Sequence, residues 1–157
     1  MRVTALVLSV LAAMAAAEAA PAAPVFDDPR GLVEYVYLPY TNGTFPEDAF
    51  ELYSPSLVQL WQDMEQRRGA TATAPLGFDP LVNGQDFDID DLAVTDPAIR
   101  GDWATVTATF TNFGVPQELR FTLVRRAEGW KIDDIESLAG DEPWRLSELL
   151  AADPLLN

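Results

Sequence analysis

The pattern of apolar and polar residues changes its period about halfway along the chain. In the first half, apolar residues recur every three or four positions, which is typical of a helix with one buried face: Leu57, Leu60, Trp61 and Met64. Further along, residues 103–113 alternate between apolar residues and threonines, a period of two that is typical of a half-buried strand. The sequence therefore predicts helices first and strands afterwards.

Capping signals indicate where the helices begin and end. Residues 27–29 (Asp-Asp-Pro) can cap and start a helix, because an N-terminal proline has no N–H that needs a partner, and Pro39 is expected to end it. A short helix is expected from residues 46–48. Residues 54–55 (Ser-Pro) repeat the start signal before the clearest helix, which the Arg-Arg-Gly at 67–69 closes.

The second half predicts an antiparallel meander that ends in a short helix. Residues 118–123 and 130–133 alternate like the first strand, and residues 114–116 and 128–129 supply the turns. Residues 144–152 suggest the short C-terminal helix. The expected fold class is α+β, with the N-terminal helices packed against one face of a curved antiparallel sheet.

The two ends of the chain differ in composition from its middle. Residues 1–20 have an early arginine, an apolar run and small residues before a cleavage pattern, which is typical of a secretory signal peptide. Residues 21–26 are a Pro/Ala tether, residues 27–152 one domain and residues 153–157 a tail. We therefore expect a periplasmic or secreted protein without a stable membrane anchor after cleavage.

Composition narrows the chemistry that the domain can perform. The chain has 25 acidic and 10 basic residues, a net charge of −15, and neither histidine nor cysteine. Zinc, copper and haem sites lose their usual ligands, a disulfide cannot form, and we expect no cofactor. The negative field disfavours nucleic acid and would attract a basic protein.

Two segments resemble a known superfamily. The strand at residues 129–135 (GWKIDDI) is similar to the last strand of the cone-shaped fold of nuclear transport factor 2 and its relatives. Residues 78–86 (FDPLVNGQD) resemble a narrower family of small exported bacterial envelope proteins, several of them lipoproteins, whose domain has no assigned function. The resemblance covers residues 27–150. It implies a hollow between helices and sheet that can hold a small ligand, and it leaves a homodimer open.

Aromatic side chains and one arginine are the candidates for lining this hollow. Tyrosines on or just after the first helix can offer a hydroxyl at the mouth of a pocket, although core packing is the alternative. The arginine lies in the middle of a strand and could hold an anion or pair with an acid, and pairing is favoured. The complete set is Tyr35, Tyr37, Tyr40, Trp61, Arg120 and Trp130.

A run of alternating acids is a candidate calcium site. Asp86, Asp88 and Asp90 begin like the loop of an EF-hand. Asp91 then stands where that loop needs glycine, and Pro97 stands where it needs a bidentate glutamate. A charged outer face that protects an edge strand is therefore the favoured interpretation, and no metal is expected.

Asp134 is the one candidate for acid/base chemistry. Alternation with Trp130 and Ile132 places Asp133 outward and Asp134 inward, where burial could raise the pKa of the carboxyl. A structural cap or a salt bridge to Arg125 or Arg126 is the alternative that we favour.

Three functions follow from these features. The leading hypothesis is a non-enzymatic module of the cell envelope that binds a small ligand. The alternatives are an acidic protein-interaction or inhibitor protein, similar in role to an immunity protein, against a basic partner, and an acid/base enzyme of the cone-fold superfamily. An enzyme is the less favoured reading.

Overall fold

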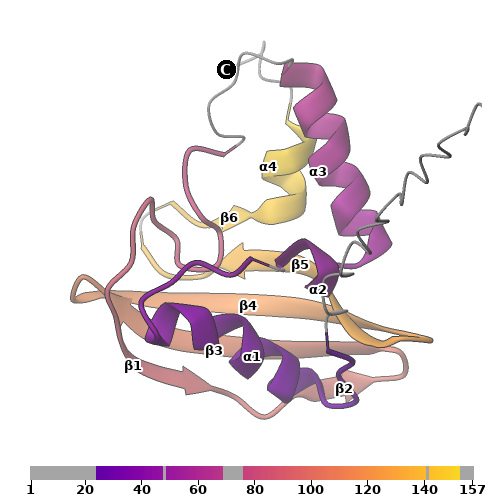
Figure 1. The fold of residues 1–157 in the computed structure, drawn as a ribbon, viewed down its shortest axis with the longest axis horizontal. Coiled ribbons are helices and arrows are strands. Elements are labelled where there is room, and N and C mark those ends of the chain that lie inside the picture. The colour runs from indigo at the N-terminus through magenta and orange to yellow at the C-terminus, as the bar shows by residue number, and fades with distance from the viewer. Residues whose placement is uncertain (1–23, 48, 69–75, 141, 153–157) are drawn as a thin grey trace, which may run out of the picture.

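The computed structural model describes residues 24–47, 49–68, 76–140 and 142–152. It confirms an α+β fold in which helices precede a curved antiparallel sheet and a short helix follows it (Figure 1). The helices are α1 (Pro29–Thr41), α2 (Ala49–Leu52), α3 (Pro55–Arg68) and α4 (Leu146–Ala151). The strands are β1 (Ile89–Val94), β2 (Ala98–Arg100), β3 (Trp103–Asn112), β4 (Val115–Arg126), β5 (Gly129–Ser137) and β6 (Trp144–Arg145).

Both predicted helix starts are confirmed. The side chain of Asp28 accepts hydrogen bonds from the backbone N–H groups of Arg30 and Gly31, at 3.3 and 2.9 Å. Ser54 does the same for Leu57, at 3.2 Å. Each side chain satisfies N–H groups that have no partner inside the helix, and a proline follows each cap.

The predicted end of the first helix was wrong, because α1 continues through Pro39 to Thr41. A proline inside a helix removes one backbone hydrogen bond. Here the last turn is held by burial, since Tyr40 is only 3% exposed and packs into the core. The backbone N–H of Asn42 then closes the helix by donating to the carbonyls of Leu38 and Pro39.

The strands form one sheet in the order β1-β3-β4-β5-β6, with β2 also paired to β3. The hairpin of β3 and β4 runs in register from Trp103 opposite Val124 to Asn112 opposite Val115. The predicted alternation is confirmed along β3, where four apolar side chains are buried and the threonines between them face outward or are half-buried. The buried four are Ala104, Val106, Ala108 and Phe110.

The core lies between the sheet and the helices. Helix α1 packs on one face of the sheet, where it contacts β1, β3 and β5, and α3 and α4 lie side by side beyond β5 (Figure 1). Tyr37, Phe121 and Ile135 are completely buried at the centre of this layer. Helices α3 and α4 are joined by Arg67, whose side chain donates a hydrogen bond to the backbone carbonyl of Leu150.

Part of the expected tether packs on the domain. The backbone N–H of Trp130 donates to the carbonyl of Phe26 at 2.8 Å, and the indole N–H of Trp130 donates to the carbonyl of Asp27 at 3.2 Å. The expected signal peptide and the tail, residues 1–20 and 153–157, lie outside the described residues. None of the helices in the described ranges is long and apolar enough to cross a membrane.

Candidate functional site

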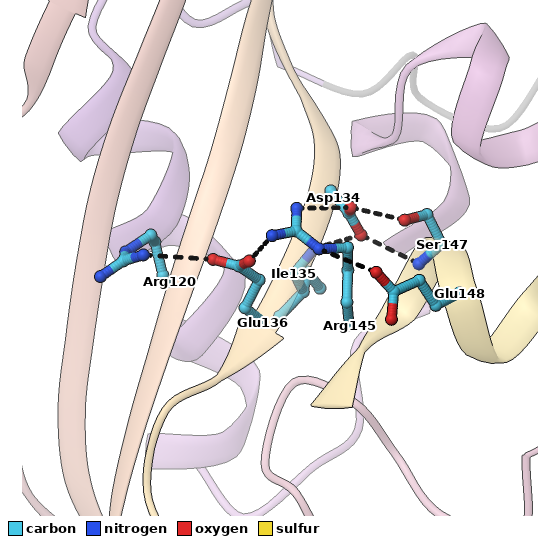
Figure 2. Close-up of polar contacts among 7 residues, drawn as sticks. All are labelled: Arg120, Asp134, Ile135, Glu136, Arg145, Ser147 and Glu148. Atoms are coloured by element: carbon cyan, nitrogen blue, oxygen red, sulfur yellow. Dashed lines mark hydrogen bonds and ion pairs between the residues drawn. The ribbon is translucent and has the colours of Figure 1, made fainter. Parts of the chain in front are cut away.

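Asp134 lies inward, as the alternation predicts, and is only 8% exposed. Its carboxylate accepts hydrogen bonds from the hydroxyl and the backbone N–H of Ser147, at 2.6 and 3.0 Å. It also accepts from the backbone N–H of Ile135 at 2.9 Å, and from the guanidinium of Arg145 at 3.4 Å (Figure 2). This acid therefore joins β5 to the first turn of α4.

The surrounding charges extend the same network across the sheet. Arg145 also pairs with Glu136, and Glu136 pairs in turn with Arg120, on the neighbouring strand, at 3.3 Å (Figure 2). Arg120 stands opposite Glu136 in the β4–β5 register, so the predicted pairing of this arginine is confirmed. Asp134 pairs with Arg145 rather than with Arg125 or Arg126.

This network has the features of a structural joint. Both carboxylate oxygens of Asp134 already accept hydrogen bonds, and Ser147 belongs to a helix turn that needs such an acceptor. A general base needs a lone pair that reaches a substrate proton. The geometry therefore favours the structural interpretation of Asp134 over the catalytic one.

The aromatic candidates separate into two groups. Tyr37 and Trp130 are buried in the core, and Tyr35 packs its ring against Phe26. Tyr40 and Trp61, in contrast, line a pocket that opens on the surface between the ends of α1, α2 and α3. Of the six candidates these two line this pocket, and the ring of Tyr37 contacts that of Tyr40 with 6.2 Å between the ring centroids.

The pocket has a volume of about 220 Å³ and a largely aromatic wall. Its described lining consists of Tyr40, Phe45, Pro46, Ala49, Phe50, Tyr53, Trp61, Phe78, Asp79, Pro80 and Leu81. Phe45 and Phe50 are about half exposed, at 50% and 49%, although they are large apolar side chains. Phe50 contacts the rings of Tyr53 and Trp61 with 5.6 Å between the ring centroids in each case, so the wall is continuous.

Asp79 is the one charged residue of the described lining. Its carboxylate accepts a hydrogen bond of 2.5 Å from the hydroxyl of Tyr40 and one of 2.9 Å from the backbone N–H of Leu81. Burial raises the pKa of the Asp79 carboxyl above its ordinary value, and these two donors oppose that shift. No ion pair joins Asp79 to a cation within the part of the chain that the structure describes.

The tyrosines around this acid stay neutral. Burial raises the pKa of Tyr40 and Tyr53 far above the usual tyrosine value, and the nearby negative charge of Asp79 raises both further. The pKa of Tyr37, which lies in the core beside Tyr40, is raised for the same reasons. Its buried hydroxyl and the indole Nε1 of Trp61 have no hydrogen-bond partner among the described residues.

The acidic run is attached to the rim of this pocket. The ring of Phe87 lies 5.0 Å from that of Tyr40 and 4.8 Å from that of Phe45, in edge-to-face geometry. Asp86 and Asp88, on either side of Phe87, are exposed. The structure does not gather these acids into a metal site: within the described residues, no group of three or more acids could hold an ion.

Asp90, the third acid of the run, lies in β1, which is irregular directly after it. The pairing of β1 with β3 shifts between Asp90 and Ala93, and Asp91 adopts a positive φ of 55°. Such a bulge bends an edge strand and discourages further pairing. The favoured interpretation, a charged edge, agrees with this placement.

Sequence reasoning did not identify Asp79, Phe45 or Phe50 as site residues. Asp79 and Tyr40 are 39 positions apart, and no local period connects them. The only sequence signal was the segment at 78–86, which carries Asp79 and Phe87 and was noted for its resemblance alone.

No protein-family model and no curated protein matches the chain. The fold is similar to a chain of the native type VI effector-immunity complex Tae3-Tai3 from Ralstonia pickettii, with a TM-score of 0.50, 18% identity, and coverage of 74% of this chain and 100% of that chain. The selenomethionine form of the same complex gives a TM-score of 0.49, 22% identity, and coverage of 73% and 99%. At these identities the likeness shows the fold alone. The resemblance to nuclear transport factor 2 stays a prediction.

Proposed function

We propose that this domain is a protein-interaction module that binds a basic partner protein, in a role similar to that of an immunity protein. The observation that carries the proposal is the aromatic pocket with an acid in its wall and exposed acids at its rim, on a chain of net charge −15. Exposed aromatic side chains are typical anchors of protein interfaces, and a negative surface steers a positive partner toward them.

The structural neighbour supports a protein partner. It is a chain of an effector-immunity complex, so a domain of this fold takes part there in a complex between proteins. We propose a comparable role, binding of a protein partner, for this chain, and the aromatic pocket with Asp79 in its wall supports it independently.

A small ligand is the weaker proposal for this fold. The centre of the layer between α1 and the sheet is filled by side chains, including those of Tyr37 and Phe121, which are fully buried. A separate and open surface pocket beside Tyr35, Leu38 and Phe45 has a volume of about 350 Å³. The aromatic pocket, at about 220 Å³, is below the range of about 300–1,000 Å³ that is usual for small-molecule sites. Its size suits one side chain of a larger partner.

The proposed function is tested by capture from lysates of the source organism, followed by binding kinetics with the purified partner. We expect a basic protein that is retained at low salt and released as salt rises. The variant Asp86→Asn/Asp88→Asn should then slow association roughly 3- to 10-fold, because rim charges act mainly on the association rate.

The matched control is Asp102→Asn/Glu128→Gln, which removes the same number of charges at the other end of the sheet. Asp102 directly precedes β3. Asp88 directly precedes β1, whose first residue pairs with the last residue of β3, so the two sites lie at opposite ends of that strand. Association that slows equally in both variants would show a general charge effect and no defined site. Failure to retain any basic protein would refute the proposed function.

We also propose that the chain is exported, on the strength of the pattern in residues 1–20. The intact mass of the protein isolated from its native host should be that of a chain from which roughly residues 1–20 have been removed. A full-length chain in the cytoplasmic fraction would contradict export and leave the binding proposal standing.

A further inference from the structure

The pocket beside Tyr40 combines two features that recognise the same chemical group. Its wall is made of aromatic rings, whose faces attract cations, and one carboxylate, Asp79, interrupts that wall. Asp79 is only partly buried, and no basic residue is found in the described lining. The site therefore offers a negative charge and ring faces without a cation of its own.

From this arrangement we infer that the pocket holds a single arginine side chain of the partner, with its guanidinium paired to Asp79 and stacked on the aromatic wall. The inference rests on the proposed function, because the arginine belongs to the bound protein. It names the chemical group that this particular site recognises.

Arginine fits the site better than lysine for two physical reasons. A guanidinium is planar and more weakly hydrated than an ammonium group, so it can stack on the exposed rings of Phe45 or Phe50. It also presents parallel N–H donors to a carboxylate. Each oxygen of Asp79 accepts one hydrogen bond, from Tyr40 or from Leu81, and each retains a second lone pair for such a donor.

The protein without its partner leaves the charge of Asp79 without a cationic partner among the described residues. Burial raises the pKa of Asp79, which shows that its charge is poorly solvated, and a bound cation would offset that penalty. Trp61 also lines the pocket, and its ring contacts the exposed ring of Phe50 with 5.6 Å between the ring centroids, so a cation bound there would lie close to the indole.

The direct test is a titration of the full chain with the capped tripeptide acetyl-Gly-Arg-Gly-amide, followed by NMR. The chain contains four tryptophans, and their indole N–H signals report four places. We expect the Trp61 signal to shift and saturate. The signals of Trp103 and Trp130 should stay, because Trp103 begins β3 outside the pocket lining and the indole of Trp130 donates to Asp27 inside the fold.

Two further peptides define what is recognised. The citrulline peptide has the same shape without the charge and should leave the Trp61 signal unchanged. The lysine peptide should bind several-fold more weakly than the arginine peptide. Equal binding of arginine and citrulline peptides, equal binding of arginine and lysine peptides, or no shift of Trp61 at all would overturn the inference.

Variants assign the effect to the pocket. Asp79→Asn keeps an acceptor for Tyr40 and should weaken binding of the arginine peptide about 10- to 100-fold. Phe50→Ala removes an exposed part of the wall and should weaken it about 2- to 5-fold. Ile99→Ala removes an equally exposed apolar side chain in β2 and should change nothing. Unchanged binding in Asp79→Asn would refute the assigned pairing.

The outcomes separate this inference from the proposed function. A basic partner that binds to the wild-type chain and to Asp79→Asn with equal affinity would retain the proposed function and remove the arginine site. If the arginine peptide binds saturably but the chain retains no basic protein, the arginine site would stand and the proposed function would fall.

Discussion

Removal of the Asp134 carboxylate should destabilise the whole domain. In Asp134→Ala, the backbone N–H and hydroxyl of Ser147 lose their acceptor, and so does the backbone N–H of Ile135. Loss of a helix-capping acceptor costs about 0.5–2 kcal/mol, and a buried donor left without a partner costs about 1–3 kcal/mol. Arg145 keeps Glu136 as a partner and adds little. The expected loss is about 3 kcal/mol.

The assay is equilibrium unfolding in urea, with the thermal midpoint as a second measurement. For a domain of this size a loss of about 3 kcal/mol lowers the Tm by about 10 °C. Ser147→Ala removes only the hydroxyl bond and should cost about 1 kcal/mol. Asp102→Ala, at an exposed turn, serves as the control and should stay within about 0.5 kcal/mol.

A variant Asp134→Ala that is as stable as Asp102→Ala would contradict this structural role. The carboxylate would then have no structural role, and an acid/base role would regain its place as an explanation for an inward acid. A large loss of stability, in contrast, would account for the inward acid without any reaction.

Three more predictions concern the pocket and the N-terminal segment. Tyr40→Phe should cost about 1–2 kcal/mol in urea unfolding and raise the pKa of Asp79 further, measured by carbon NMR of the carboxyl, because the hydroxyl that lowers it is gone; an unchanged pKa would contradict the hydrogen bond. Because folding raises the pKa of Asp79, the folded state binds this proton more tightly, so the stability of the wild type relative to Asp79→Asn should fall as pH rises from about 4 through the folded pKa; a rise would show the opposite shift. Gly129→Ala should lower the free energy of unfolding in urea more than Gly114→Ala, although both glycines have a positive φ. A Cβ at position 129 would meet the carbonyl of Phe26 at 2.6 Å, whereas one at position 114 would meet nothing within 4 Å. Equal losses of stability would show that the segment around Phe26 is not packed on β5.

Local patterns were sufficient for most of the fold. The capping groups of Asp28 and Ser54 act on residues two or three positions away, so the sequence alone locates the starts of α1 and α3. The alternation of Ala104 and Val106 with threonines fixes which face of β3 is buried, because side chains of a strand alternate between faces. Pro39 misled the same reasoning, since tertiary burial of the next residue outweighed a local preference.

The candidate site was mostly beyond such reasoning. The sequence indicates Tyr40 and Trp61 as candidates for a ligand-binding hollow and the acidic run as a charged edge strand, with a calcium loop as the disfavoured alternative. In the structure, Phe87 packs on Tyr40 and thereby places the neighbouring acids at the edge of the pocket. Nothing in the spacing of residues 40 and 87 predicts that contact.

The order of residues along the chain is enough to assign the class of this protein: helices before a meander, one buried face per strand, a strongly negative net charge, and no histidine or cysteine chemistry. These properties depend on short-range periodicity and on composition. Contacts between distant segments, in contrast, give the Asp134 carboxylate its partners Ser147 and Arg145, and they place Asp79 in an aromatic pocket whose described lining holds no basic residue. The availability of a charged group depends on which distant residues reach it, and packing of the whole chain settles that.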